Sequence, residues 1–213
     1  MSTRTHSSET LSTDFKIDIT DHSLGRNKPQ QVARKLVLPM FVMALAGFAG
    51  GLIVAITRAA ELSDSGASDT TEALHHIGAG FMFIGFAAVF AAISFAIARI
   101  LGEFRAGGGE VQDTIGTTTV NTLKMPASAR VFLGGMVMAM MLIVIPVILH
   151  FVFAADVSDT VASIEASEER FIVLEGIRRI GVALYLVAIA FGLATIIKVL
   201  RFESIRIREL PNA

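Results

Sequence analysis

The sequence contains no cysteine. Without thiols the chain can form no disulfide framework, no thiolate metal site, no iron–sulfur cluster and no covalent attachment of a c-type haem. Non-covalent haem and metal sites built from histidine and carboxylate ligands stay open. An excess of positive charge is also missing, since 18 Lys and Arg face 19 Asp and Glu. No electrostatic attraction to nucleic acid is therefore expected.

Apolar residues, in contrast, are abundant and gather in long segments. They make up 53% of the 213 residues. A helix needs about 20 apolar residues to cross a hydrocarbon core of about 30 Å. The segments predict transmembrane helices at about 36–58, 76–101, 131–154 and 171–200. Because their connections are short to medium, we expect an all-α integral membrane domain over 36–201, with four transmembrane helices in an antiparallel up-down bundle.

The distribution of Lys and Arg predicts the orientation of these helices. A basic collar precedes the first helix, and further cations follow the second and fourth helices. The positive-inside rule then places the N and C termini in the cytoplasm, in a multi-pass protein of the cell (inner) membrane. Residues 1–35 are expected to form a polar, disordered cytoplasmic arm, 102–130 a cytoplasmic loop and 202–213 a cytoplasmic tail.

Two glycine-containing segments have alternative interpretations. Gly47 and Gly51 have the small-xxx-small spacing that lets helix backbones approach, either in a dimer or within the bundle, and we favour packing within the bundle. Gly107–Gly109 predicts a flexible joint, and the threonine-rich stretch 113–130 that follows could form a short strand or hairpin.

Ionisable residues are predicted to meet at the outer ends of the helices. The set consists of Arg58, His75, His76, His150, Glu175, Arg178 and Arg179. Arg178 and Arg179 are informative because positive charge beside a short translocated loop opposes the usual orientation bias. A simpler interpretation is that Glu175, three and four residues earlier, pairs with both arginines within the helix.

The first ligand hypothesis for this cluster is a b-type haem. His76 and His150 come from two antiparallel helices and could be the axial ligands, while Arg58, Arg178 and Arg179 could meet the propionates. The chemistry would be one-electron transfer. Counting 1.5 Å per residue from Ile100 and Val131 places His76 about 7 Å farther out than His150, an offset that the fold must remove.

The alternative to haem is a metal ion held by His75, His76, His150 and a carboxylate, with Glu175, Glu72 and Asp156 as candidates. Imidazole and carboxylate ligands suit Zn, Cu(II) or Fe(II). We rank this below haem because adjacent histidines on a helix point about 100° apart.

Function is predicted from the overall character of the chain. The centres of the later helices hold only Ser94, Tyr185 and Thr195 as polar residues, which disfavours a transporter. Small-residue helix faces, acidic outer loops and a polar arm favour contacts with the lipid bilayer and with other membrane protein subunits. We therefore predict an accessory or structural subunit of a larger membrane complex, such as a respiratory or oxidase complex, without catalytic activity of its own. The alternative is a b-type haem electron-transfer protein.

Overall fold

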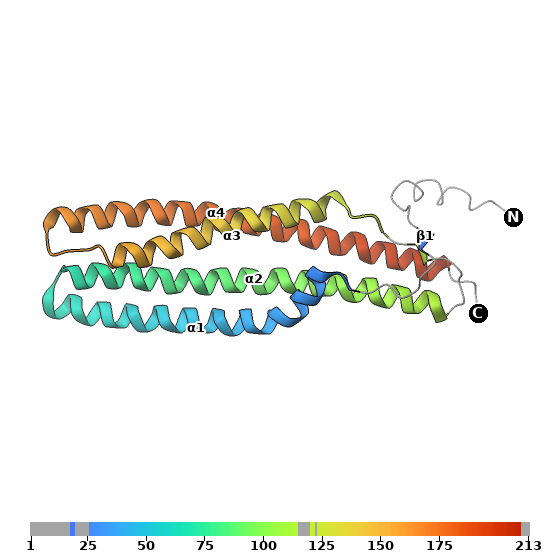
Figure 1. The fold of residues 1–213 in the computed structure, drawn as a ribbon, viewed down its shortest axis with the longest axis horizontal. Coiled ribbons are helices and arrows are strands. Elements are labelled where there is room, and N and C mark those ends of the chain that lie inside the picture. Colours follow the sequence, from blue (N-terminus) through green and yellow to red (C-terminus); the bar gives the residue numbers. More distant parts are fainter. Residues whose placement is uncertain (1–17, 20–25, 115–119, 122, 210–213) are drawn as a thin grey trace. The chain divides into compact units, whose positions relative to one another are not determined.

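A computed structural model describes residues 18–19, 26–114, 120–121 and 123–209 of the chain. Its elements, in order, are β1 (Asp18–Ile19), α1 (Lys28–Ser65), α2 (Asp69–Thr114), β2 (Val120–Asn121), α3 (Ala127–Ala154) and α4 (Val161–Glu209). The four long helices are packed in a bundle (Figure 1). All four are long and apolar enough to cross a membrane, which confirms the prediction of an all-α, multi-pass helical protein.

Each helix is longer than the apolar segment that predicts it. The connections between α1 and α2 and between α3 and α4 shrink to residues 66–68 and 155–160. Gly107–Gly109, expected to be a flexible joint, are helical residues of α2, and the tail from Phe202 continues α4 as far as Glu209. Apolar runs mark only the part of a helix that is buried or faces lipid, so polar first and last turns escape a hydropathy-based prediction.

Local capping explains where two of the helices begin. Ser68 and Thr71 bond reciprocally across the first turn of α2: the Ser68 amide donates to Thr71 Oγ1 over 2.8 Å, and the Thr71 amide to Ser68 Oγ over 3.3 Å. Gly66 before this turn has φ of 72°, a conformation that favours glycine. At α4 the Ser163 amide donates to Thr160 Oγ1 over 3.2 Å, so Thr160 caps the helix.

The helices contribute to two compact units. The histidine unit comprises Lys35–Ser94 and Leu133–Ile189, and the basic unit comprises Met1–Arg34, Phe95–Phe132 and Ala190–Ala213. The centre of the histidine unit is a cluster of Phe90, Ala139, Ile143 and Tyr185, in which the Phe90 and Tyr185 rings stack at 4.6 Å. Its helices therefore pack through aromatic and small side chains.

Helix α1 packs on α2 in the histidine unit through glycine. A Cβ atom at Gly47 would lie 2.6 Å from the backbone nitrogen of Gly85, and one at Gly51 would lie 2.7 Å from the Met82 side chain. These glycines therefore let the α1 and α2 backbones approach closely within the chain. The favoured interpretation, packing within the bundle, is confirmed.

The basic unit contains the described part of the N-terminal arm up to Arg34. Arg26 pairs with Glu103 of α2 at 2.6 Å. Strand β1 pairs antiparallel with β2, with Ile19 opposite Val120. The threonine-rich stretch thus contributes a short strand, β2, to a pair with the arm. The rest of the predicted arm, except for the first turns of α1, lies outside the described residues.

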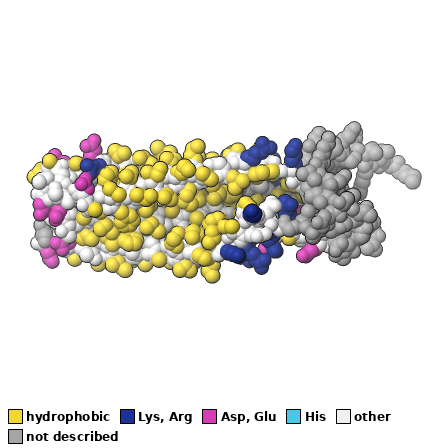
Figure 2. Space-filling view, viewed as in Figure 1, with side chains coloured by type: hydrophobic (Ala, Val, Ile, Leu, Met, Phe, Trp, Pro, Cys, Tyr) yellow, Lys and Arg dark blue, Asp and Glu magenta, His cyan; other side chains and the backbone are white. Residues whose placement is uncertain are grey.

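The surface separates apolar, acidic and basic side chains. Hydrophobic side chains cover most of the helix surface in view, and acidic side chains gather where the connections of the histidine unit lie (Figure 2). Lys and Arg side chains gather on the helices of the basic unit (Figure 2). Only 17% of the most apolar segment of α1 is buried, against 44% for α2. An apolar outer surface of this kind is suited to contact with a lipid bilayer.

Candidate functional site

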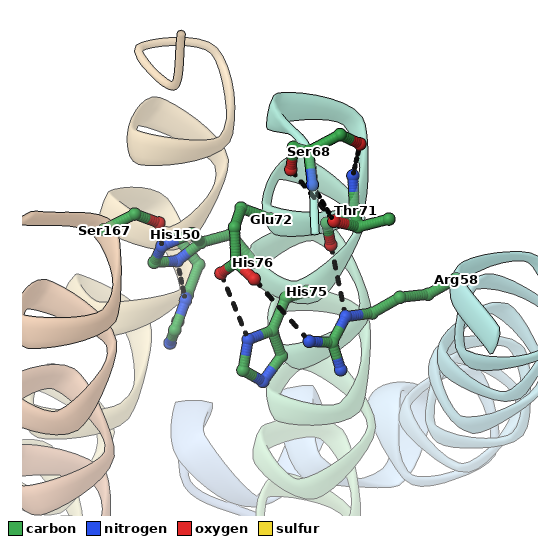
Figure 3. Close-up of polar contacts among 8 residues, drawn as sticks. All are labelled: Arg58, Ser68, Thr71, Glu72, His75, His76, His150 and Ser167. Carbon is green, nitrogen blue, oxygen red and sulfur yellow. Dashed lines mark hydrogen bonds and ion pairs between the residues drawn. The ribbon is translucent and has the colours of Figure 1, made fainter. Parts of the chain in front are cut away.

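Two histidines predicted to share a site meet inside the histidine unit. The Nδ1 atoms of His76 on α2 and His150 on α3 are 2.8 Å apart, and both residues are 0% exposed (Figure 3). His76 Nε2 forms a second hydrogen bond, at 3.0 Å, with Ser167 Oγ of α4. One hydrogen-bonded chain of three side chains thus connects α2, α3 and α4.

The hydrogen-bond chain restricts the protons on the two imidazoles. A bond between two Nδ1 atoms needs a single proton, so one ring is the donor and the other the acceptor. The Ser167 hydroxyl can donate or accept, and it fits either arrangement. His150 Nε2 is buried and has no hydrogen-bond partner in the described part of the chain. It is the ring nitrogen of the pair that is left for a ligand.

Aromatic rings enclose the histidine pair. Phe171 of α4 lies edge-on to both rings, at 5.6 Å from His76 and 5.3 Å from His150, and Phe83 of α2 lies edge-on to His150 at 4.9 Å. Phe153 completes the enclosure on the side of His76, at 6.1 Å. The rings exclude water, which strengthens each hydrogen bond inside and raises the cost of losing one.

A second group of polar residues lies at the start of α2 (Figure 3). Arg58 of α1 donates from Nε to the Thr71 carbonyl oxygen over 3.1 Å, and its Nη2 is 3.8 Å from Glu72. Glu72 is also 3.7 Å from Nδ1 of His75, whose ring stacks on Phe171 at 3.9 Å. Arg58 and His75 are therefore turned toward Glu72.

Arg178, Arg179 and Glu175 lie well inside α4, which begins at Val161. The sequence predicted them at the outer start of this helix because its apolar run begins at Phe171. Arg178 contacts Glu175, and its guanidinium lies over the Phe83 ring at 4.5 Å. Arg179 Nε donates to the same oxygen of Glu175, Oε1, over 3.3 Å. The expected pairing of Glu175 with both arginines is present.

The structure brings together only part of the predicted ligand cluster. His76 and His150 are in contact, and Phe83 touches both His150 and Arg178, whereas Arg58 and Arg179 have other partners. The offset of about 7 Å expected between the histidines is absent. That count assumed that α2 and α3 end level at Ile100 and Val131, but both helices continue past these residues.

The geometry sets conditions for haem and for a metal ion. Metal–imidazole bonds are about 2 Å long, so two nitrogens on opposite sides of one ion lie about 4 Å apart. The 2.8 Å contact between His76 and His150 must open before a haem iron can enter between these nitrogens. Within the described ranges, no group of three or more His, Asp or Glu side chains is placed to hold a metal ion. Glu175, the expected carboxylate, is instead bonded to two arginines.

Comparison with known proteins found no relative of this chain. No protein-family model, curated protein or solved structure matches the chain. We therefore infer function from the geometry of the site.

Ser167, Phe171 and Phe83 are site residues that sequence reasoning did not identify. Ser167 was assigned to an acidic loop, although it lies seven residues before the buried Leu174 and on the same face of α4. Extending the helix back to Val161 would have shown this register. Phe83 and Phe171 carry no such signal, because an aromatic residue in an apolar run usually faces lipid or the core.

Proposed function

We propose that this protein is an accessory or structural subunit of a larger membrane protein complex, such as a respiratory or oxidase complex. One observation carries the proposal: Arg179 exposes 76% of its side chain between exposed apolar residues of α4, with Ile172 on one side and Leu186 on the other. A charge in such a surface is costly against lipid and is usually matched by a partner. A subunit contact supplies that partner.

The distribution of charge supports the orientation of this subunit with both termini in the cytoplasm. The basic unit exposes cations on all four helices: Lys28, Arg34, Arg99, Arg130, Lys198 and Arg201. The connections of the histidine unit and the adjoining helix ends carry acidic residues, among them Asp64, Asp156 and Asp159. The positive-inside rule assigns the basic unit to the cytoplasmic face.

The proposal is tested by measuring the size of the particle that contains this chain. Native membranes are cross-linked before solubilisation in a mild detergent, and the purified particle is analysed by native mass spectrometry. A stoichiometric complex with another membrane protein is expected, well above the 22.7 kDa of the chain. A chain that stays alone both in cross-linked membranes and in detergent contradicts the proposal.

The second candidate is a b-type haem electron-transfer protein, favoured by the meeting of His76 and His150. Two fully buried imidazoles from two helices, enclosed by aromatic rings, form the kind of environment that holds a membrane haem. Haem binding requires the two imidazole rings to separate. The side chain of Arg178 lies against Phe83, close enough to reach the edge of the haem site.

Replacing His150 with alanine tests this candidate. If haem is bound, the dithionite-reduced minus air-oxidised spectrum of the native protein shows a sharp reduced band, and His150→Ala loses it while still inserting into the membrane. His75→Ala is the control, since His75 stacks on Phe171 and is turned toward Glu72. A native protein without a haem band removes the candidate, and unchanged haem in His150→Ala removes this residue as a ligand.

A further inference from the structure

Arg179 is the starting point because its exposure differs from that of its neighbour Arg178. Arg179 exposes 76% of its side chain, whereas Arg178 exposes 22% and lies over the ring of Phe83. Both point their guanidinium groups at one oxygen of Glu175, which is itself only 19% exposed. Arg178 thus faces the interior of the histidine unit, and Arg179 faces outward.

The charges of Arg178, Arg179 and Glu175 do not cancel. Two guanidinium groups carry two positive charges, and the one carboxylate of Glu175 carries a single negative charge. No other carboxylate contacts these arginines in the described part of the chain. The local excess of one positive charge therefore lies on the outward side, at Arg179.

The surface around Arg179 is apolar in both directions along α4. On the N-terminal side Ile172 is 70% exposed and Val173 56%, and on the C-terminal side Ile180 is 63% exposed and Leu186 56%. These side chains are suited to lipid or to another helix, not to water. Arg179 lies one to two turns from the apolar residues on its N-terminal side, so its excess charge is set within the apolar face.

The backbone of α4 is accessible beside this charge. A Cβ atom at Gly176 would have no neighbour within 4 Å, and Ala183, seven residues further, is also exposed. Residues three and four positions from Arg179 share its face of the helix. Small residues there allow another helix backbone to come within reach of the guanidinium group.

We propose that this face of α4, comprising Ile172, Gly176, Arg179, Ile180 and Ala183, is the docking surface for a transmembrane helix of a different protein. The partner helix carries an Asp or Glu whose carboxylate pairs with Arg179. The proposal rests on the function proposed above and specifies the chemistry of the partner. Charge complementarity supports it, because a partner carboxylate neutralises the excess charge inside the bilayer.

A second copy of this chain fits the surface less well. Apart from Glu175, the acidic side chains of the histidine unit lie in its connections and in the helix turns next to them: Glu61, Asp64, Asp69, Glu72, Asp156, Asp159, Glu165, Glu168 and Glu169. Glu175 lies within one turn of Arg179 along α4, but its carboxylate is already paired with Arg178 and Arg179. The complementary carboxylate therefore comes from another chain.

The test combines photo-cross-linking with charge reversal in the full-length protein in its native membrane. A photo-reactive amino acid replaces Ala183, and the cross-linked product is identified by mass spectrometry. The expected product is a membrane protein with an Asp or Glu inside a transmembrane segment. Arg179→Gln is expected to lower the cross-link yield at least about tenfold, since truncating one member of a desolvated charge pair weakens binding strongly.

Matched variants separate charge from other effects. Lys198→Gln removes an exposed cation from the same helix outside this face, and it should leave the yield within about twofold, as expected for an exposed charge. Arg179→Glu should abolish the product, and exchanging the partner carboxylate for Arg should restore it. Restoration by this exchange is expected only for a direct pair.

The outcomes distinguish this inference from the proposed function. If the complex forms and survives Arg179→Gln, the protein is a subunit but this docking surface is wrong. A product consisting of two copies of this chain, or of lipid alone, also overturns the inference. If cross-linked membranes contain no complex at all, the proposed function itself fails.

Discussion

Replacing Gly47 with alanine is expected to lower the free energy of unfolding by about 2–3 kcal/mol, as for an overpacked core. The new Cβ atom would lie 2.6 Å from the backbone nitrogen and 2.8 Å from the Cα atom of Gly85. Backbone atoms of a helix cannot move aside as a side chain can, so α1 and α2 must separate. The measurement is unfolding in mixed micelles by titration with SDS, followed by circular dichroism.

Two other glycines provide the controls. Gly134→Ala on α3 meets nothing within 4 Å, and it should leave stability unchanged or raise it by up to about 1 kcal/mol through helix propensity. Gly51→Ala should have an intermediate effect, because its Cβ atom would meet the flexible Met82 side chain. Equal effects at Gly47 and Gly134 would show that the close contact of α1 with α2 is not important for stability.

Replacing His150 with leucine is expected to destabilise the protein by about 2 kcal/mol, the usual cost of a buried polar group that loses its partner. The substitution approximately conserves volume and leaves Nδ1 of His76 without the hydrogen bond that spans 2.8 Å. The aromatic rings around the pair exclude a replacement water. The same SDS titration measures the loss.

A double substitution isolates the interaction. His76→Leu with His150→Leu removes both polar groups, so it should cost at least about 1 kcal/mol less than the sum of the two single substitutions. Ser167→Ala is a milder control, since His76 keeps its bond to His150 and loses only the one to Ser167. Additive single effects would mean that the two imidazoles do not interact in the membrane.

The stability of the His76 and His150 pair distinguishes a structural role from haem binding. A strong coupling between His76 and His150 supports a structural role for the pair, because it connects α2, α3 and Ser167 of α4. A protein that binds haem at this pair should instead gain stability with haem bound and lose that gain in His150→Ala. Comparing stability with and without the cofactor therefore separates the two roles.

The sequence determined the features that depend on a single segment. Length and apolar character predicted four helices, because spanning a hydrocarbon layer requires about 20 apolar residues in each. The i, i+3 and i, i+4 spacing predicted that Glu175 pairs with Arg178 and Arg179, since residues so placed are neighbours on any helix. The glycine spacing at Gly47 and Gly51 predicted close helix packing for the same local reason.

Only the tertiary structure decided how the segments lie against one another. Helix ends were misplaced because polar first turns carry no hydropathy signal, and this error moved Ser167 into a loop and Arg178 to a helix start. The contact of His76 with His150, and of Gly47 with Gly85, depends on how far one helix is shifted along another. That shift is set by side-chain packing between helices distant in sequence, and no single segment encodes it.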